Sequence, residues 1–342
     1  MQPGKVDRDF FGAVIEDRLG ADRADVALGP RFGADFGLLT VGDRAVALAT
    51  DPVFVLRDLG LERAAWFAVH VVLSDVALSG LSPTHLAVDL AFPPETDRET
   101  VASIWAVVDA EARDLGVSVV TGHTGAYAGA SFPTIGAGTA LAVGDPNEVV
   151  RPTGARQGDK LLVTRGPAIE TTGILATVFG DDLDLPERTV EAAKRRFYDT
   201  SPIESAQVAA AAGPVTAMHD ATEGGLANAL HELAHASEVG LAVDAERVPM
   251  LDGVEAVCQY FDVDPWVASS SGTVLLTVAP GGEQAVLEAL AGADVTAAAV
   301  GEVTESGTVS VDGRELAPPD TDPFWPTYER AREVFGPPEQ RD

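Results

Sequence analysis

Along the first 150 residues of this chain, segments with apolar residues at helical spacing alternate with segments that have the pattern of β-strands. Residues 62–80 carry apolar side chains at helical spacing on most of their circumference, which predicts a buried helix. A second, amphipathic helix is predicted at 101–115. Strands are predicted at 44–50, 86–92, 117–121 and 134–143. Consecutive strands mixed with strand–helix–strand units are typical of an α/β (α+β) domain.

The alternation starts again after residues 144–158, which contain two prolines, three glycines and few apolar side chains. Such a stretch is typical of a connection between domains. We therefore predict an N-terminal domain over residues 1–150 and a C-terminal domain over residues 151–342. In the second domain strands are predicted at 160–164, 272–278, 295–303 and 308–311, and helices at 168–179, 186–197, 202–212 and 283–291.

Candidate chemistry is concentrated in residues 215–233, where a short buried strand leads into a helix that starts near Gly225. Asp220 and Thr222 are residue types that cap helices. Gly224 and Gly225 have no side chain to keep a ligand away from the free N–H groups of the first helical turn. A helix N-terminus of this kind suits phosphate, and nearby carboxylates suit the Mg²⁺ that accompanies a nucleotide.

Three aspartates in the first domain are further candidates. Asp35 lies in a turn, and Asp51 follows Thr50 where Pro52 is expected to stop a strand. Asp75 lies on the buried helix. An unpaired carboxylate removed from water costs several kcal/mol, so Asp75 requires a cation, a cluster of donors or a solvated cleft.

Composition narrows the choice of partners. The chain has 53 acidic and 23 basic residues, which gives a formal net charge of −30 spread along its whole length. Such a surface repels nucleic acid and anionic membranes, and it indicates a salt-adapted, cytoplasmic protein. The single cysteine, Cys258, permits no internal disulfide. The sequence shows neither a signal pattern nor an apolar run of membrane-spanning length, so we predict neither a nucleic-acid nor a membrane partner.

Several short motifs occur in a characteristic order. They are Thr50-Asp51, Ser74-Asp75-Val76-Ala77-Leu78-Ser79-Gly80, Gly122-His123-Thr124, Gly158-Asp159-Lys160 with Ile169-Glu170, and His219-Asp220-Ala221-Thr222-Glu223-Gly224-Gly225. Each motif is weak alone, but in this order they resemble the aminoimidazole ribonucleotide (AIR) synthase, or PurM-like, superfamily, and most closely its HypE-like branch of hydrogenase maturation proteins. The resemblance extends from about Gly33 to Val303.

The resemblance implies a two-domain PurM-like fold whose N-terminal α/β domain pairs with its copy in a homodimer, with ATP between the two domains. By similarity, Mg²⁺ would be bound by Asp35, Asp51 and Asp75. The nucleotide and its phosphates would be held by Thr50, Gly122, Thr124, Asp220, Thr222, Glu223, Gly224 and Gly225. Such enzymes use ATP to phosphorylate or dehydrate a small-molecule or carrier-bound substrate. His123 and His219 are candidates for a catalytic base, although each also fits a hydrogen-bonded turn histidine.

The chain departs from individual branches of the superfamily. HypE proteins end in a reactive cysteine, whereas this sequence ends at Asp342 and its cysteine is Cys258. Thiamine-monophosphate kinases usually carry two adjacent aspartates where this chain has Ala34-Asp35, and an aspartate at the position of His123. A thiamine-monophosphate-kinase-like phosphotransferase and a non-catalytic nucleotide-binding regulatory protein therefore stay open as alternatives.

A further motif points to a different chemistry. His231-Glu232-Leu233-Ala234-His235 matches the H-E-x-x-H pattern of zinc peptidases, which places two imidazoles on one helical face. A third ligand is required, for which Glu255 is a candidate. Because the motif lies in the helix already expected to bind phosphate, a zinc peptidase is a minor alternative.

Overall fold

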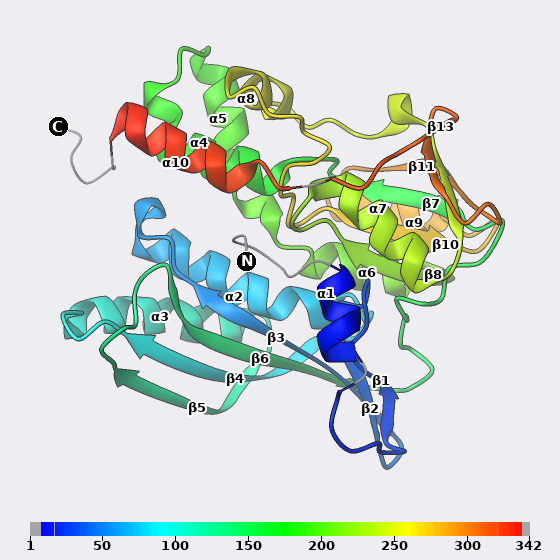
Figure 1. Cartoon of the computed structure of the whole chain (residues 1–342), viewed down its shortest axis with the longest axis horizontal. Coiled ribbons are helices and arrows are strands. Elements are labelled where there is room, and N and C mark those ends of the chain that lie inside the picture. The colour runs from blue at the N-terminus through cyan, green and yellow to red at the C-terminus, as the bar shows by residue number, and fades with distance from the viewer. Residues whose placement is uncertain (1–7, 17, 320, 337–342) are drawn as a thin grey trace.

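The computed structural model describes residues 8–16, 18–319 and 321–336 of the 342-residue chain. The chain forms two α/β domains, each built on one mixed sheet with helices packed against it (Figure 1). The predicted fold class is therefore confirmed. No helix of the described residues combines the length and the apolar character needed to cross a bilayer.

The first domain has a six-stranded sheet in the order β1-β2-β3-β6-β4-β5. Its strands are β1 (Val26–Leu28), β2 (Gly37–Val41), β3 (Arg44–Phe54), β4 (Pro83–Phe92), β5 (Ser118–Ala126) and β6 (Thr134–Gly144). Its helices are α1 (Arg8–Phe11), α2 (Leu61–Ala77) and α3 (Arg98–Asp114). Figure 1 shows α2 between this sheet and the second domain, which explains why α2 is apolar on nearly all sides.

Pro52 does not end β3, contrary to the prediction, since the strand continues to Phe54. β2 pairs with β3 only as far as Leu48, so beyond that residue β6 is the single neighbour of β3 among the described strands. The N–H that proline lacks is therefore not needed by a second neighbour. A register shift between Pro52 and Phe54 makes room for the ring.

Gly122-His123-Thr124-Gly125 does not form the predicted turn either. β5 continues through these residues to Ala126 as an edge strand parallel to β4. A Cβ atom at Gly122 would lie 2.3 Å from the carbonyl oxygen of Val88, so this glycine permits close approach of two strands. Nearly every residue of β5 is exposed on both faces of the sheet.

The second domain has a seven-stranded sheet in the order β13-β12-β9-β11-β7-β10-β8. Its strands are β7 (Lys160–Thr164), β8 (Val215–Asp220), β9 (Gly240–Val243), β10 (Val274–Val278), β11 (Ala297–Thr304), β12 (Val309–Val311) and β13 (Arg314–Glu315). Its helices are α4 (Ile169–Phe179), α5 (Glu187–Arg195), α6 (Ile203–Ala212), α7 (Gly225–Ala236), α8 (Val254–Tyr260), α9 (Glu283–Gly292) and α10 (Phe324–Phe335).

Helices cover both faces of this second sheet. Leu226, Leu230 and Leu233 of α7 belong to one buried cluster with Leu161 and Val163 of β7. On the other face, α9 packs against α6 and belongs to the main core, which continues into the first domain. The apolar residues predicted at helical spacing from Gly225 onward therefore form the face of α7 that packs against the sheet.

Helix α10 has no counterpart among the predicted elements, and it connects the two domains. It packs on α4 of the second domain. The Tyr328 hydroxyl donates to Asp58 Oδ2 at 2.5 Å, and Arg332 Nε lies 3.0 Å from the same oxygen. Asp58 belongs to a short 3₁₀-helix of the first domain, η2 (Arg57–Leu59), so α10 is held from both sides.

Candidate functional site

A buried chain of hydrogen bonds joins the two domains at His219, the penultimate residue of β8. Its Nδ1 lies 2.8 Å from Asp35 Oδ2 of the first domain, and its Nε2 lies 3.0 Å from Glu232 Oε2 of α7. These side chains are 3%, 9% and 11% exposed, respectively. The backbone around Asp35 also lies against α7, because a Cβ atom at Gly33 would be 2.4 Å from the carbonyl oxygen of Glu232.

The charge state of His219 follows from these neighbours. Burial by itself would lower the pKa of His219, but attraction by Asp35, its hydrogen bond and the contact with Glu232 raise that pKa well above the usual value. Both ring nitrogens of the imidazolium are occupied by carboxylates, so the ring has no free position from which to accept a proton. This geometry supports a connecting role for His219 and gives no support to its prediction as a catalytic base.

Asp51 and Asp75 lie on two elements of the first domain that pack against each other, β3 and α2. Asp51 is opposite Gly138 of β6 and alternates with Ala49 on the buried face of β3. Val72 of α2 lies directly over Gly138, since its Cγ1 atom is 2.6 Å from the position of an added Cβ. Asp75 follows three residues later, which places it on the same side of α2 as Val72. The two predicted metal ligands therefore come from a strand and a helix in direct contact.

Asp35 comes two residues before β2, near the part of β3 that carries Thr50. β2 begins at Gly37, opposite Leu48 of β3, and continuation of that register would place Asp35 opposite Thr50. Thr50 Oγ1 lies 2.9 Å from Thr139 Oγ1 of β6. Because Asp35 is bonded to His219, this end of the first sheet faces the turn between β8 and α7.

The turn between β8 and α7 is closed by a carboxylate from elsewhere in the chain. Gly224 and Gly225 are buried and have φ values of 78° and 60°, a backbone conformation that residues with a side chain rarely adopt. The N-cap residue is Gly224, so the prediction that Asp220 or Thr222 caps the helix is wrong. Instead, Gly224 N–H donates to Asp322 Oδ2 at 2.7 Å. The helix N-terminus predicted to be open is thus occupied by a side chain 98 residues away.

A second carboxylate, Glu170, lies beside this turn in the first turn of α4. Ser271 donates to Glu170 Oε2 from its N–H at 3.2 Å and from its hydroxyl at 2.6 Å. Burial, together with the charges of Asp322 and Glu223, raises the pKa of Glu170 to about 7 in spite of these hydrogen bonds. Burial first, and the neighbouring carboxylates second, therefore favour a proton on Glu170 near neutral pH.

Gly122, His123 and Thr124 do not join these residues within one chain. They lie on β5, the strand at the edge of the first sheet that is far from the second domain in Figure 1. The His123 Nε2 atom and the Tyr127 hydroxyl are hydrogen-bonded to each other. A part for these residues in nucleotide binding or proton transfer stays a prediction that requires another copy of the chain.

The donor set suits Mg²⁺, although no complete metal site is preassembled. Among the described residues, no group of three or more His, Cys, Asp or Glu side chains is arranged to hold a metal ion. His219 engages one oxygen of Asp35, Oδ2, so the metal-ligand role of Asp35 stays a prediction. Mg²⁺ in nucleotide sites commonly takes one or two carboxylates and completes its shell with phosphate and water. Asp51 and Asp75 fit that requirement.

The zinc-peptidase interpretation of His231-Glu232-Leu233-Ala234-His235 is wrong. Glu232, which would be the general base, is committed to His219. The His235 ring packs edge-on against Phe32 with ring centroids 5.4 Å apart. Since the described residues also hold no metal-binding group of three ligands, Glu255 does not complete a zinc site.

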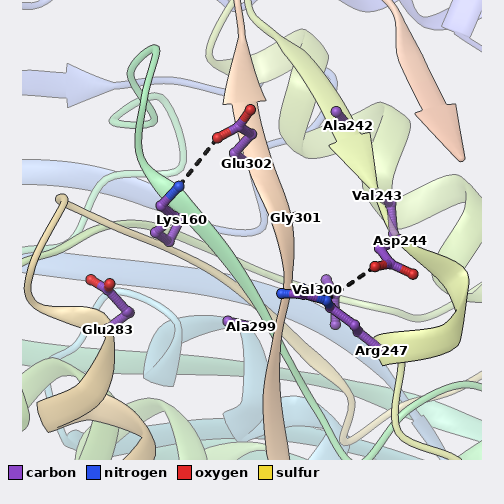
Figure 2. A pocket seen from close by; sticks show the side chains of 10 residues that line it. All are labelled: Lys160, Ala242, Val243, Asp244, Arg247, Glu283, Ala299, Val300, Gly301 and Glu302. Atoms are coloured by element: carbon purple, nitrogen blue, oxygen red, sulfur yellow. Dashed lines mark hydrogen bonds and ion pairs between the residues drawn. The ribbon is translucent and has the colours of Figure 1, made fainter. Parts of the chain in front are cut away.

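A groove of about 480 Å³ lies on β7, β9 and β11, away from the turn between β8 and α7. Figure 2 shows that its two cationic side chains each face an acid, Lys160 with Glu302 and Arg247 with Asp244. Small residues, among them Ala299 and Gly301, form part of its lining. Glu283 adds a third acidic side chain to the lining, so the groove has more acidic than basic groups and does not favour an anionic ligand.

Two residues of the site were not identified from the sequence. Asp322 was missed because its contact with Gly224 is non-local, yet Asp322-Pro323 before an apolar helical pattern is a recognisable helix start. Glu170 belongs to one of the quoted motifs, but its environment depends on Ser271, which only the fold brings near.

The two α/β domains, each built on a mixed sheet, have a PurM-like fold. Residues 33–142 match the N-terminal domain of the AIR synthase related proteins, and residues 156–314 match the C-terminal domain. The chain therefore belongs to the AIR synthase related protein family, as the order of its motifs predicted.

Curated relatives carry two kinds of name. A putative hydrogenase expression/formation protein of Methanocaldococcus jannaschii is 24% identical over 84% of this chain and 84% of its own. Carbamoyl dehydratase HypE of Rhizobium leguminosarum bv. viciae is 30% identical over 76% of this chain and 73% of its own. Thiamine-monophosphate kinase of Halobacterium salinarum is 32% identical over 74% of this chain and 81% of its own.

Solved structures share the fold over most of the chain. HypE in a HypE–HypF complex gives a TM-score of 0.70 at 22% identity, covering 91% of this chain and 99% of that one. Hydrogenase maturation protein HypE in complex with ATP gives 0.66 at 21% identity, covering 93% and 92%. AaThiL complexed with AMPPCP and TMP gives 0.66 at 20% identity, covering 84% and 92%.

Proposed function

We propose that this protein is an ATP- and Mg²⁺-dependent enzyme of the AIR synthase/HypE-like type that acts on a small-molecule or carrier-bound substrate. The observation that carries the proposal is the 2.8 Å hydrogen bond between Asp35 and His219, because it holds the aspartate-bearing end of the first sheet against the β8–α7 turn. The HypE solved with ATP and the AaThiL solved with AMPPCP support a nucleoside triphosphate as the ligand.

The proposed roles divide between the two domains. Asp51 and Asp75 would hold Mg²⁺, with Thr50 beside them. The bound ion would neutralise phosphate charge, which is the main requirement of phosphoryl transfer. From the second domain, the phosphates would be faced by Asp220, Thr222, Glu223, Gly224 and Gly225. The chain itself would then contribute mainly the orientation of the triphosphate and the exclusion of water.

We further propose a homodimer formed through β5. This strand is at the edge of its sheet and exposed on both faces, with Val119 38% and Val120 54% exposed. An unpaired edge of this kind is ready to pair with another chain. Pairing there would also place Gly122, His123 and Thr124 at the junction of two copies. The net charge of −30 supports a salt-rich cytoplasm as the place of action.

Nucleotide binding by two aspartate variants tests the site. Asp51→Asn and Asp75→Asn should each weaken binding of a non-hydrolysable Mg²⁺–ATP analogue by about tenfold or more, because each removes a charged metal ligand. Isothermal titration in molar salt measures the affinity, since a charge of −30 opposes compaction at low ionic strength. Asp109→Asn is the matched control, as Asp109 is exposed on α3 and paired only with Arg113 among the contacts described. Unchanged affinity in both site variants would exclude this assignment.

A specific observation favours a thiamine-monophosphate-kinase-like phosphotransferase as the second candidate function. Cys258 is buried, and burial raises the pKa of its thiol to about 11, so it is a poor nucleophilic carrier for a dehydration reaction. ADP release upon addition of thiamine monophosphate would support this candidate. Nucleotide binding without turnover on any small acceptor would instead favour the non-catalytic regulatory alternative.

A further inference from the structure

The contact between Asp322 and the start of α7 is an unusual way to satisfy a helix N-terminus. Asp322 Oδ2 accepts from Gly224 N–H at 2.7 Å and from Ser269 Oγ at 2.8 Å. Its other oxygen accepts from Phe324 N–H at 2.7 Å and so caps the start of α10. One carboxylate therefore links the proposed phosphate-binding turn to the C-terminal helix.

The segment that delivers Asp322 is held at several points. We call residues 321–335 the C-terminal strap. Tyr328 and Arg332 bond to Asp58 of the first domain, and Trp325 contacts Phe54 with ring centroids 5.3 Å apart. Figure 1 shows the chain passing from β13 toward the left of the view, near α7, before it enters α10. The strap thus joins both domains across the junction where the nucleotide is proposed to bind.

The carboxylate of Asp322 lies where an anion would bind to the N-terminus of α7. A helix N-terminus offers N–H donors and a positive dipole end to a single negative group. The carboxylate of Asp322 uses the Gly224 N–H that a phosphate oxygen would use, so both cannot bind there together. Asp322 Oδ2 is held there by one backbone N–H and one serine hydroxyl, and no basic side chain pairs with it among the contacts described. A phosphate that accepts from the same Gly224 N–H can therefore take its place.

We propose that the C-terminal strap is an autoinhibitory closure, in which the carboxylate of Asp322 takes the place of a nucleotide phosphate at Gly224. The inference rests on the proposed function, because it regulates the same nucleotide site. Phosphate binding displaces Asp322, and displacement removes the cap of α10. A nucleotide then has lower apparent affinity for the closed protein, in proportion to the fraction of molecules that are open.

The closure is tested by whether Asp322→Ala raises or lowers the affinity for a nucleotide. Asp322→Ala should bind a non-hydrolysable Mg²⁺–ATP analogue about tenfold more tightly than the wild type, because a hydrogen bond to a charged group no longer competes. Ser269→Ala removes one of the donors to Asp322 and should tighten binding by a smaller factor. Glu333→Gln makes the same charge change at an exposed position of α10 and should leave the affinity unchanged.

Each other result has a definite meaning. Weaker binding by Asp322→Ala, which is expected of a metal or substrate ligand, overturns the closure, and so does unchanged binding. Absence of binding in the wild type and in every variant overturns the proposed function together with the closure. Hydrogen exchange gives a second measurement on the wild type, where the analogue should speed exchange in residues 324–335. Slower or unchanged exchange in α10 contradicts displacement of the strap.

Discussion

Replacing Glu170 by glutamine should stabilise the protein increasingly as the pH rises. The pKa of Glu170 is raised from 4.5 to about 7 in the folded state, mainly by burial. A raised carboxyl pKa contributes stability that is fully present below 4.5 and is lost as the pH rises through 7. Linkage then gives a cost of about 1 kcal/mol at pH 5.5 and about 3 kcal/mol at pH 8.5. Because glutamine does not ionise and still accepts from Ser271, the difference between variant and wild type should grow by about 2 kcal/mol over this range.

Urea denaturation in molar salt, repeated at about pH 5.5, 7 and 8.5, measures the difference in free energy of unfolding between the variant and the wild type. Any fixed cost of placing the amide in the site cancels, because only the change with pH is compared. Glu305→Gln is the matched control, since Glu305 is exposed in the same domain. Parallel stability curves for wild type and Glu170→Gln would refute the argument that Glu170 holds its proton in the crowded carboxylate cluster.

Two further predictions concern the domain junction and the edge strand. Asp35→Asn should lower the free energy of unfolding by about 3 kcal/mol, because it breaks a buried ion pair and leaves His219 beside Glu232 alone. The loss should be largest below pH 6.5 and should shrink as the pH rises through the raised pKa of His219; a loss independent of pH in urea denaturation would contradict the charged state. Val120→Lys on β5 should leave stability unchanged but convert a dimer to a monomer in light scattering, and a wild-type protein that is already monomeric would disprove pairing through β5.

Elements with a strong local pattern could be predicted from the sequence. α2 and α7 are examples, because their apolar faces meet a sheet and repeat at helical spacing. The pair Asp312-Gly313 is typical of a tight hairpin turn, and both residues adopt the positive φ that such a turn requires. The division into domains at residue 150 stays a prediction, although the first sheet ends at Gly144 and the second begins at Lys160.

Features that depend on a distant partner could not be predicted. Pro52 is tolerated within β3 because β2 stops earlier, and Gly122 is required by the carbonyl group of Val88. Neither fact is visible in the residues that flank these positions. The contacts of the candidate site also depend on distant partners. Asp35 bonds to His219, its role as a metal ligand stays a prediction, and the turn expected to be open is closed by Asp322.

The close approach of Gly33 to α7 limits how this protein can be recombined with its relatives. Any side chain at this position would push against the backbone of Glu232, which lies in the other domain and about two hundred residues later in the sequence. A hybrid that joins the first half of this chain to the second half of another member would therefore have to carry the matching α7 as well. The natural unit for exchange is the pair formed by residues 32–36 and α7, and not either half alone.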